Sequence, residues 1–117
     1  MSAVAEAAAT LRRGGLVVYP TETVYGIGTA LSAGDAGGAR VRAAKGSPAG
    51  RPFLLLAAST EASLALWSEV PPWARELAAE AWPGPLTLVG PAREGLPACV
   101  TGTAADGRAS LAVRVPG

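Results

Sequence analysis

Short runs of consecutive apolar residues alternate along this chain with stretches whose apolar residues recur every three or four positions. Consecutive apolar residues are typical of strands buried on both faces, and the longer period is typical of helices that bury one face. The predicted strands are 16–19, 27–31, 53–57, 86–89 and 111–115. The predicted helices are about 2–13, 35–45, 60–67 and 71–81. This alternation predicts an α/β fold in which a mainly parallel or mixed sheet is layered with helices.

Residues at the ends of the predicted helices support their boundaries. Ser2 and Asp35 are expected N-caps, since their side chains can accept hydrogen bonds from the first free amides of a helix. Trp73, Leu77 and Ala81 have the spacing of one buried helical face. The loop 91–108 is rich in Pro, Gly and small residues and has no predicted element.

Length and composition narrow the class of protein. The 117 residues are expected to form a single domain, residues 1–117. The chain has no histidine, which excludes a Ser-His-Asp triad and a histidine-ligated metal. Cys99 is the lone cysteine, so no internal disulfide and no cysteine cluster for zinc can form. The longest apolar run, 53–58, is too short to span a bilayer, and no secretory signal is visible, so a cytoplasmic protein with no membrane partner is expected.

Charge draws attention to one loop. Lys45 is the single lysine, and the other nine basic residues are arginine. This composition indicates that the position favours a compact ammonium group over the planar guanidinium of arginine. It opens the glycine- and proline-rich segment 45–52, which also contains Arg51 and suits an anion. A lysine that merely favours the end of a helix dipole is the competing interpretation.

Two further segments carry candidate chemistry. The segment 19–28 follows a predicted buried strand, at the edge where α/β sheets bind ligands, and it offers hydroxyl groups as well as Gly26 and Gly28, which let a backbone approach a ligand. The segment 82–87 is a rigid turn that places Thr87 at the start of a strand. An ordinary polar turn and a simple helix stop are the structural alternatives.

These segments, in this order, resemble the YrdC (TsaC) family over about residues 10–117. The matching motifs are Tyr19-Pro20-Thr21-Glu22-Thr23-Val24-Tyr25-Gly26-Ile27-Gly28, Lys45-Gly46-Ser47-Pro48 with Arg51-Pro52-Phe53, Pro83-Gly84-Pro85-Leu86-Thr87, and Ala112-Val113-Arg114-Val115-Pro116. The resemblance implies a twisted mixed sheet flanked by helices, with a positively charged cavity on one side. It also implies synthesis of threonylcarbamoyl-AMP from L-threonine, bicarbonate and ATP, with release of pyrophosphate, for the threonylcarbamoyladenosine modification of tRNA.

The resemblance assigns roles to residues of this chain. Lys45 and Arg51 are the expected catalytic residues, because they would neutralise charge on the triphosphate or the carbamate. The expected substrate-binding residues are Thr21, Thr23, Tyr25, Thr87 and Arg114. Magnesium is expected with the nucleotide, held by phosphate oxygens and water, because no carboxylate cage is visible. Glu22 could be a ligand or face solvent.

The match departs from the family pattern in two places. Ser47 stands where the family has an arginine, and the serine-alanine-asparagine motif that follows the last strand in the family is not present, so the sheet is expected to lack the family's C-terminal part. The alternative is a non-catalytic YrdC-like module that binds double-stranded RNA or a nucleotide. Further candidate partners are tRNA, tRNA-modification proteins and a second copy of the chain.

Overall fold

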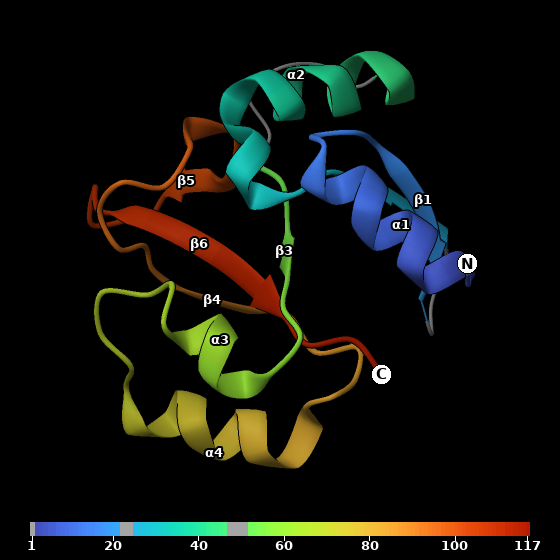
Figure 1. Ribbon diagram of the computed structural model, residues 1–117. Helices are drawn as coiled ribbons and strands as arrows, with labels where there is room; N and C mark the ends of the chain where they lie inside the picture. The colour runs from blue at the N-terminus through green and yellow to red at the C-terminus, as the bar shows by residue number, and fades with distance from the viewer. Residues whose placement is uncertain (1, 22–24, 47–51) are drawn as a thin grey trace. The chain divides into compact units, whose positions relative to one another are not determined.

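The computed structural model describes residues 2–21, 25–46 and 52–117 (Figure 1). The backbone divides into two compact units, Met1–Arg51 and Pro52–Gly117. Each unit has its own strands and helices. In the described part of the chain, no helix has both the length and the apolar composition needed to cross a membrane.

The first unit combines helices with a pair of strands. Its elements are α1 (Ala3–Arg12), β1 (Val17–Pro20), β2 (Tyr25–Gly28), the 3-10 helix η1 (Leu31–Ala33) and α2 (Gly34–Lys45). The strands β1 and β2 are antiparallel, with a register that runs from the pair Val17–Gly28 to the pair Pro20–Tyr25. The predicted strand 27–31 is therefore shifted toward the N-terminus, because its residues pair with β1 only as far as Gly28.

Local sequence signals explain the ends of α1 and α2. The Ser2 hydroxyl accepts a hydrogen bond from the amide of Ala5 at 3.1 Å, which confirms the predicted N-cap. Asp35 lies instead in the first turn of α2, where its carboxylate complements the helix dipole. Within α2, a Cβ atom on Gly37 would lie 2.5 Å from the Cβ of Ala33. The glycine is therefore a packing requirement rather than a weakness in the helix.

The second unit contains a mixed sheet, as predicted. Its elements are β3 (Leu55–Leu56), α3 (Thr60–Leu64), α4 (Pro72–Ala81), β4 (Leu88–Pro91), the 3-10 helix η2 (Ala98–Val100), β5 (Thr101–Thr103) and β6 (Ala109–Arg114). The strand β6 is central, since it runs parallel to β3 and antiparallel to β4 and β5. The strand β5 falls in the segment predicted to be a loop, because its three residues are stabilised by pairing with β6 and have no pattern of their own.

The two faces of this sheet differ. On one face Leu88, Leu111 and Val113 are buried, and Figure 1 draws α3 and α4 together on one side of the sheet. On the opposite face Val89 is 58% exposed. The prediction that every strand is buried on both faces is therefore wrong for β4, and the 66% exposure of Val18 shows the same for β1. A short apolar run does not reveal by itself how many faces a strand buries.

The buried face of α4 also differs from the prediction. Ala74 and Ala78 are fully buried, whereas Trp73 is 50% exposed and Leu77 is 40% exposed. Residues four positions apart lie on one helical face, so the helix packs through its small side chains. Such side chains let the helix axis lie close to its neighbours, and the sequence spacing fits both faces equally well.

The cap of α3 provides a first stability prediction. The Ser59 hydroxyl accepts a hydrogen bond from the amide of Ala62 at 3.1 Å. Replacing Ser59 by alanine is expected to lower the free energy of unfolding by about 1 kcal/mol. Urea denaturation followed by circular dichroism measures the change. Ser68→Ala, an exposed serine in the same unit, is the control and should change it by less than about 0.5 kcal/mol.

Candidate active site

Thr87 and Arg114 meet at one end of the mixed sheet. In the register of β4 and β6, Leu88 pairs with Val113. Thr87 directly precedes Leu88 and Arg114 directly follows Val113, so both residues lie at the same end of the β4–β6 pair. Arg114 is only 8% exposed, whereas Thr87 is exposed. The sheet thus brings together two predicted site residues from distant motifs.

Arg114 is held at the carboxyl ends of two parallel strands. It pairs in register with Leu56 of β3, and its carbonyl oxygen accepts a hydrogen bond from the amide of Ala57 at 2.9 Å. Ligands of α/β sheets bind at this edge. A guanidinium there can bind a carboxylate or a phosphate through two parallel hydrogen bonds. The location supports the predicted substrate-binding role of this residue.

The turn before Thr87 is tied to the same end of β6. The amide of Gly84 donates a hydrogen bond to the carbonyl oxygen of Val115 at 2.8 Å, directly after Arg114. A Cβ atom at Gly84 would lie 2.3 Å from the carbonyl oxygen of Ala81, so only glycine fits this position. The Trp82–Pro83 peptide bond is cis. The proline- and glycine-rich turn is therefore part of the candidate site's framework as well as the end of α4.

The described part of the first motif lies at one end of the β1–β2 pair. Thr21 directly follows β1 and Tyr25 begins β2, where it is 76% exposed. The ring of Tyr19 lies across β2, since a Cβ atom at Gly26 would be 2.9 Å from that ring and one at Gly28 would be 3.3 Å from it. These glycines accommodate an aromatic side chain from the neighbouring strand. This packing is a structural reason for two residues that the sequence assigned to ligand approach.

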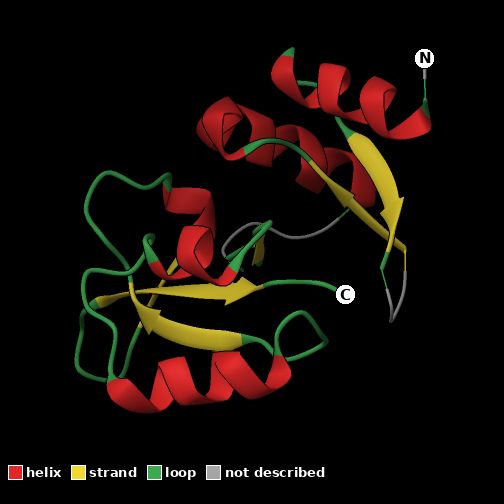
Figure 2. Ribbon diagram, turned by 60° about the horizontal axis from the view of Figure 1, so that its bottom comes forward, coloured by secondary structure: helices red, strands yellow, loops and turns green. Residues whose placement is uncertain are grey.

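Lys45 is the last residue of α2 and is exposed. Gly46 caps the helix in the left-handed conformation, with φ of 69°. Among the described residues Lys45 makes no hydrogen bond or ion pair, which leaves its ammonium group available to an anion. Figures 1 and 2 draw the C-terminal end of α2 apart from the end of the β1–β2 pair that carries Thr21 and Tyr25. The ribbon of this unit therefore does not place the end of α2 beside that end of the β1–β2 pair.

Several predicted residues lie outside the described part of the chain. These are Thr23 and Arg51, together with Glu22 and Ser47. Among the described residues, no group of three or more Asp, Glu, His or Cys could hold a metal ion. A magnesium ion bound mainly by phosphate oxygens and water stays a prediction.

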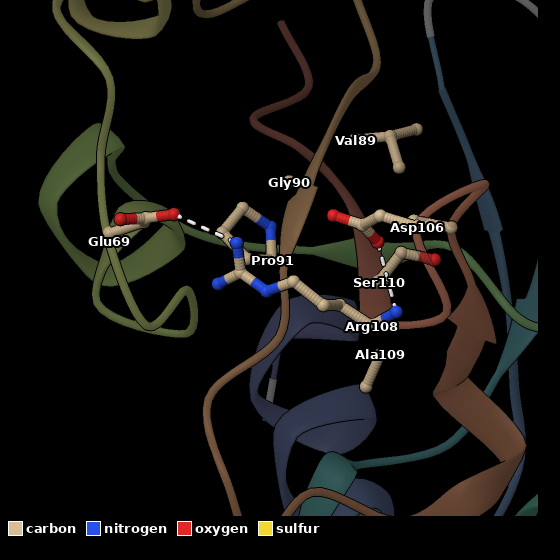
Figure 3. A pocket seen from close by; sticks show the side chains of 9 residues that line it. Glu69, Val89, Gly90, Pro91, Asp106, Arg108, Ala109 and Ser110 are labelled. Atoms are coloured by element: carbon tan, nitrogen blue, oxygen red, sulfur yellow. Dashed lines mark hydrogen bonds and ion pairs between the residues drawn. The ribbon is translucent and has the colours of Figure 1, made fainter.

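A shallow hollow of about 200 Å³ lies at the start of β6 (Figure 3). The guanidinium of Arg108 donates to the carboxylate of Glu69 at 3.2 Å, and the Arg108 amide donates to the carboxylate of Asp106 at 3.0 Å. No sequence signal marked these residues, because Glu69 lies between α3 and α4 whereas Asp106 and Arg108 lie between β5 and β6. Arg108 and Arg114 are about 20 Å apart along β6, at about 3.3 Å per residue, so the hollow is separate from the Thr87–Arg114 end.

The ion pair in this hollow is expected to contribute little to stability. The side chains of Arg108 and Glu69 are 55% and 63% exposed, so water screens their attraction. A double-mutant cycle with Arg108→Ala and Glu69→Ala should give a coupling free energy below about 1 kcal/mol. Denaturant unfolding of the four proteins measures it. A coupling of several kcal/mol would show that the pair is shielded from water in solution.

Comparison with known proteins gives consistent matches. The family model Sua5_yciO_yrdC, described as "Telomere recombination", matches residues 9–117. The chain is 44% identical over 110 residues to threonylcarbamoyl-AMP synthase of Pyrococcus abyssi (strain GE5 / Orsay), covering 94% of this chain and 31% of that protein. It is 43% identical over 113 residues to threonylcarbamoyl-AMP synthase of Halorhodospira halophila (strain DSM 244 / SL1), covering 96% and 56%.

The fold matches solved structures as well. The crystal structure of P. abyssi Sua5 complexed with L-threonine matches with a TM-score of 0.85 and 43% identity, covering 96% of this chain and 32% of that one. The match confirms the predicted α/β fold and the predicted resemblance to the YrdC family. The chain spans between about a third and somewhat more than half of the length of these relatives, from 31% to 56%.

Proposed function

The chain belongs to the Sua5/YciO/YrdC family, and from this membership we propose that it forms threonylcarbamoyl-AMP from L-threonine, bicarbonate and ATP. The observation that carries the proposal is the likeness to Sua5 complexed with L-threonine, which extends over 96% of this chain. The location of Thr87 and Arg114 at the same end of the β4–β6 pair supports it from the geometry of this chain.

The proposed reaction has two bond-forming steps. The amino group of L-threonine attacks bicarbonate, and loss of water gives a carbamate. A carbamate oxygen then attacks the α-phosphorus of ATP, a new P–O bond forms, and pyrophosphate leaves with the electrons of the broken P–O bond. The protein mainly has to position the reactants and neutralise their negative charge, since no covalent intermediate with the protein is needed.

Lys45 and Arg51 are proposed to neutralise the negative charge that moves onto the departing pyrophosphate. An exposed ammonium group with no partner among the described residues suits this role. A magnesium ion bound to the triphosphate would share the charge. Lysine acts on phosphates as a mobile point charge, whereas arginine forms directed pairs with phosphate oxygens.

Arg114 is proposed to bind the carboxylate of L-threonine, with the Thr87 hydroxyl as a second hydrogen-bonding group. The shared sheet edge of these two residues supports the assignment. Thr21, Thr23 and Tyr25 are proposed to bind substrate through their hydroxyl groups. The single domain of residues 1–117 that the sequence leads us to expect stays part of this proposal.

The product is proposed to serve the threonylcarbamoyl modification of tRNA, in a cytoplasmic setting. Contact with tRNA, with modification proteins or with a second copy of the chain is part of the same proposal.

The activity can be tested on the 117-residue chain itself. The protein is incubated with ATP, L-threonine, magnesium and ¹³C-bicarbonate, and mass spectrometry follows the labelled adenylate while a coupled assay follows pyrophosphate. We expect both products in equal amounts, and neither when L-threonine is omitted. Absence of the labelled adenylate at every substrate concentration would reject the proposal. RNA or nucleotide binding without turnover, with a steep salt dependence for RNA, would support the non-catalytic module instead.

A further inference from the structure

Trp82 is bound at both its backbone and its side chain. Its amide donates to the carbonyl oxygen of Ala78 at 3.0 Å, which is the last helical bond of α4. Its indole Nε1 donates to the carbonyl oxygen of Leu86 at 2.7 Å, and the side chain is 7% exposed. The indole therefore closes the turn from the end of α4 to the residue that precedes Thr87.

The Leu86 carbonyl group determines how Thr87 is placed. This oxygen and the Thr87 nitrogen belong to one planar peptide unit. A hydrogen bond that holds the oxygen therefore also fixes the orientation of the Leu86–Thr87 peptide plane. At the other end of the turn, the amide of Gly84 is bound to Val115, beyond Arg114. The turn is thus held at two points, and Thr87 can keep its place at the end of the sheet that carries Arg114.

We propose that Trp82 is a positioning residue for the substrate site, which acts by orienting the Leu86–Thr87 peptide so that the Thr87 hydroxyl and Arg114 face the same substrate. The inference rests on the proposed function and adds a residue that makes no contact with the substrate. A group misplaced by about 1 Å loses much of its effect on a reaction, which is why such a bond matters for activity.

A merely structural role is the competing explanation, because a buried tryptophan also fills space. Trp67 provides a matched control in the same unit. It is 5% exposed, and its indole Nε1 donates to the carbonyl oxygen of Leu111 at 3.1 Å, in the middle of β6. Trp82→Phe and Trp67→Phe each keep an aromatic ring and remove one indole hydrogen bond, which is partly buried for Trp82 and buried for Trp67. Only the first of these bonds leads to Thr87.

The test compares these two variants with the unchanged chain. The first measurement is the ¹⁵N–¹H NMR signal and hydrogen-exchange rate of the Thr87 amide, which report its orientation whether or not the chain turns over substrate. The second is the Kd for L-threonine by calorimetry, with the KM for L-threonine and kcat from the pyrophosphate assay. We expect Trp82→Phe to shift the Thr87 signal and to raise the Kd and KM about tenfold, the effect of one lost hydrogen bond. Trp67→Phe should change the Kd by less than about twofold.

An unchanged Thr87 amide in Trp82→Phe, or equal changes of the L-threonine Kd in both variants, would overturn the inference. A wild-type chain that neither binds L-threonine nor forms the adenylate would overturn the proposed function instead. In that case the Thr87 amide would still show whether Trp82 orients this residue, so the two failures are distinguishable.

Discussion

Replacing Lys45 by alanine is expected to lower the rate of threonylcarbamoyl-AMP formation by about 100-fold or more, the usual effect of removing one group that stabilises charge in a transition state. The ammonium group is exposed and has no partner among the described residues, so its loss should cost little stability. The measurement is kcat from the release of pyrophosphate at saturating ATP, L-threonine and bicarbonate, with the unfolding curve recorded for the same preparation.

Two matched variants show whether the effect is specific. Lys45→Arg keeps the positive charge but replaces the compact ammonium group by a planar guanidinium group. We expect this variant to retain only part of the rate of threonylcarbamoyl-AMP formation. Arg12→Ala removes an exposed cation from the last turn of α1 and should leave the rate within about twofold of the original. If Lys45→Ala retained the full rate, the proposed role of this residue would be wrong. Equal losses in Lys45→Ala and Arg12→Ala would indicate a general effect of net charge.

The largest stability effect is expected at Gly90, where alanine should lower the free energy of unfolding by about 3 kcal/mol and Tm by about 10 °C. A Cβ atom at this position would lie 2.4 Å from the indole ring of Trp67. That ring is 5% exposed and bound to Leu111, so it cannot move without losing its hydrogen bond. Thermal and urea unfolding followed by circular dichroism give both quantities.

Val89 is the control for this substitution because it precedes Gly90 on the same strand and lies on the opposite face of the sheet. Its side chain is 58% exposed, so Val89→Ala should change the free energy of unfolding by less than about 1 kcal/mol. Equal effects of Gly90→Ala and Val89→Ala would show that the Trp67 ring does not press on β4 as described.

The elements with local signals could be predicted from the sequence. Ser2 marks the start of α1 through a hydrogen bond that depends only on residues three positions apart, and Pro72 marks the start of α4 in the same local way. The length and composition of the apolar runs predicted β1, β4 and β6 to within about two residues. The motifs around Thr87 and Arg114 were also recognisable without coordinates.

Features that depend on distant partners could not be predicted. The strand β5 exists because β6 lies beside it, and its own sequence is Thr-Gly-Thr. The buried face of α4 depends on what packs against it. The prediction from the large side chains of Trp73 and Leu77 therefore selected a face that is partly exposed. The location of Thr87 and Arg114 at the same end of the sheet follows from the register of β4 and β6, which single-sequence patterns do not determine.

Side chains along β6 alternate between the two faces of the sheet, so the register of this strand determines the direction in which Arg114 points. Leu111 and Val113 are buried in the apolar interior, and Arg114 lies between Val113 and Val115, so its side chain projects to the opposite face of the strand. A slip of the strand by a single residue would turn the guanidinium toward the helices and expose the valines to solvent. A sheet with this shifted register would be too unstable to persist. The stable register therefore also fixes the face of the sheet on which the Arg114 side chain lies.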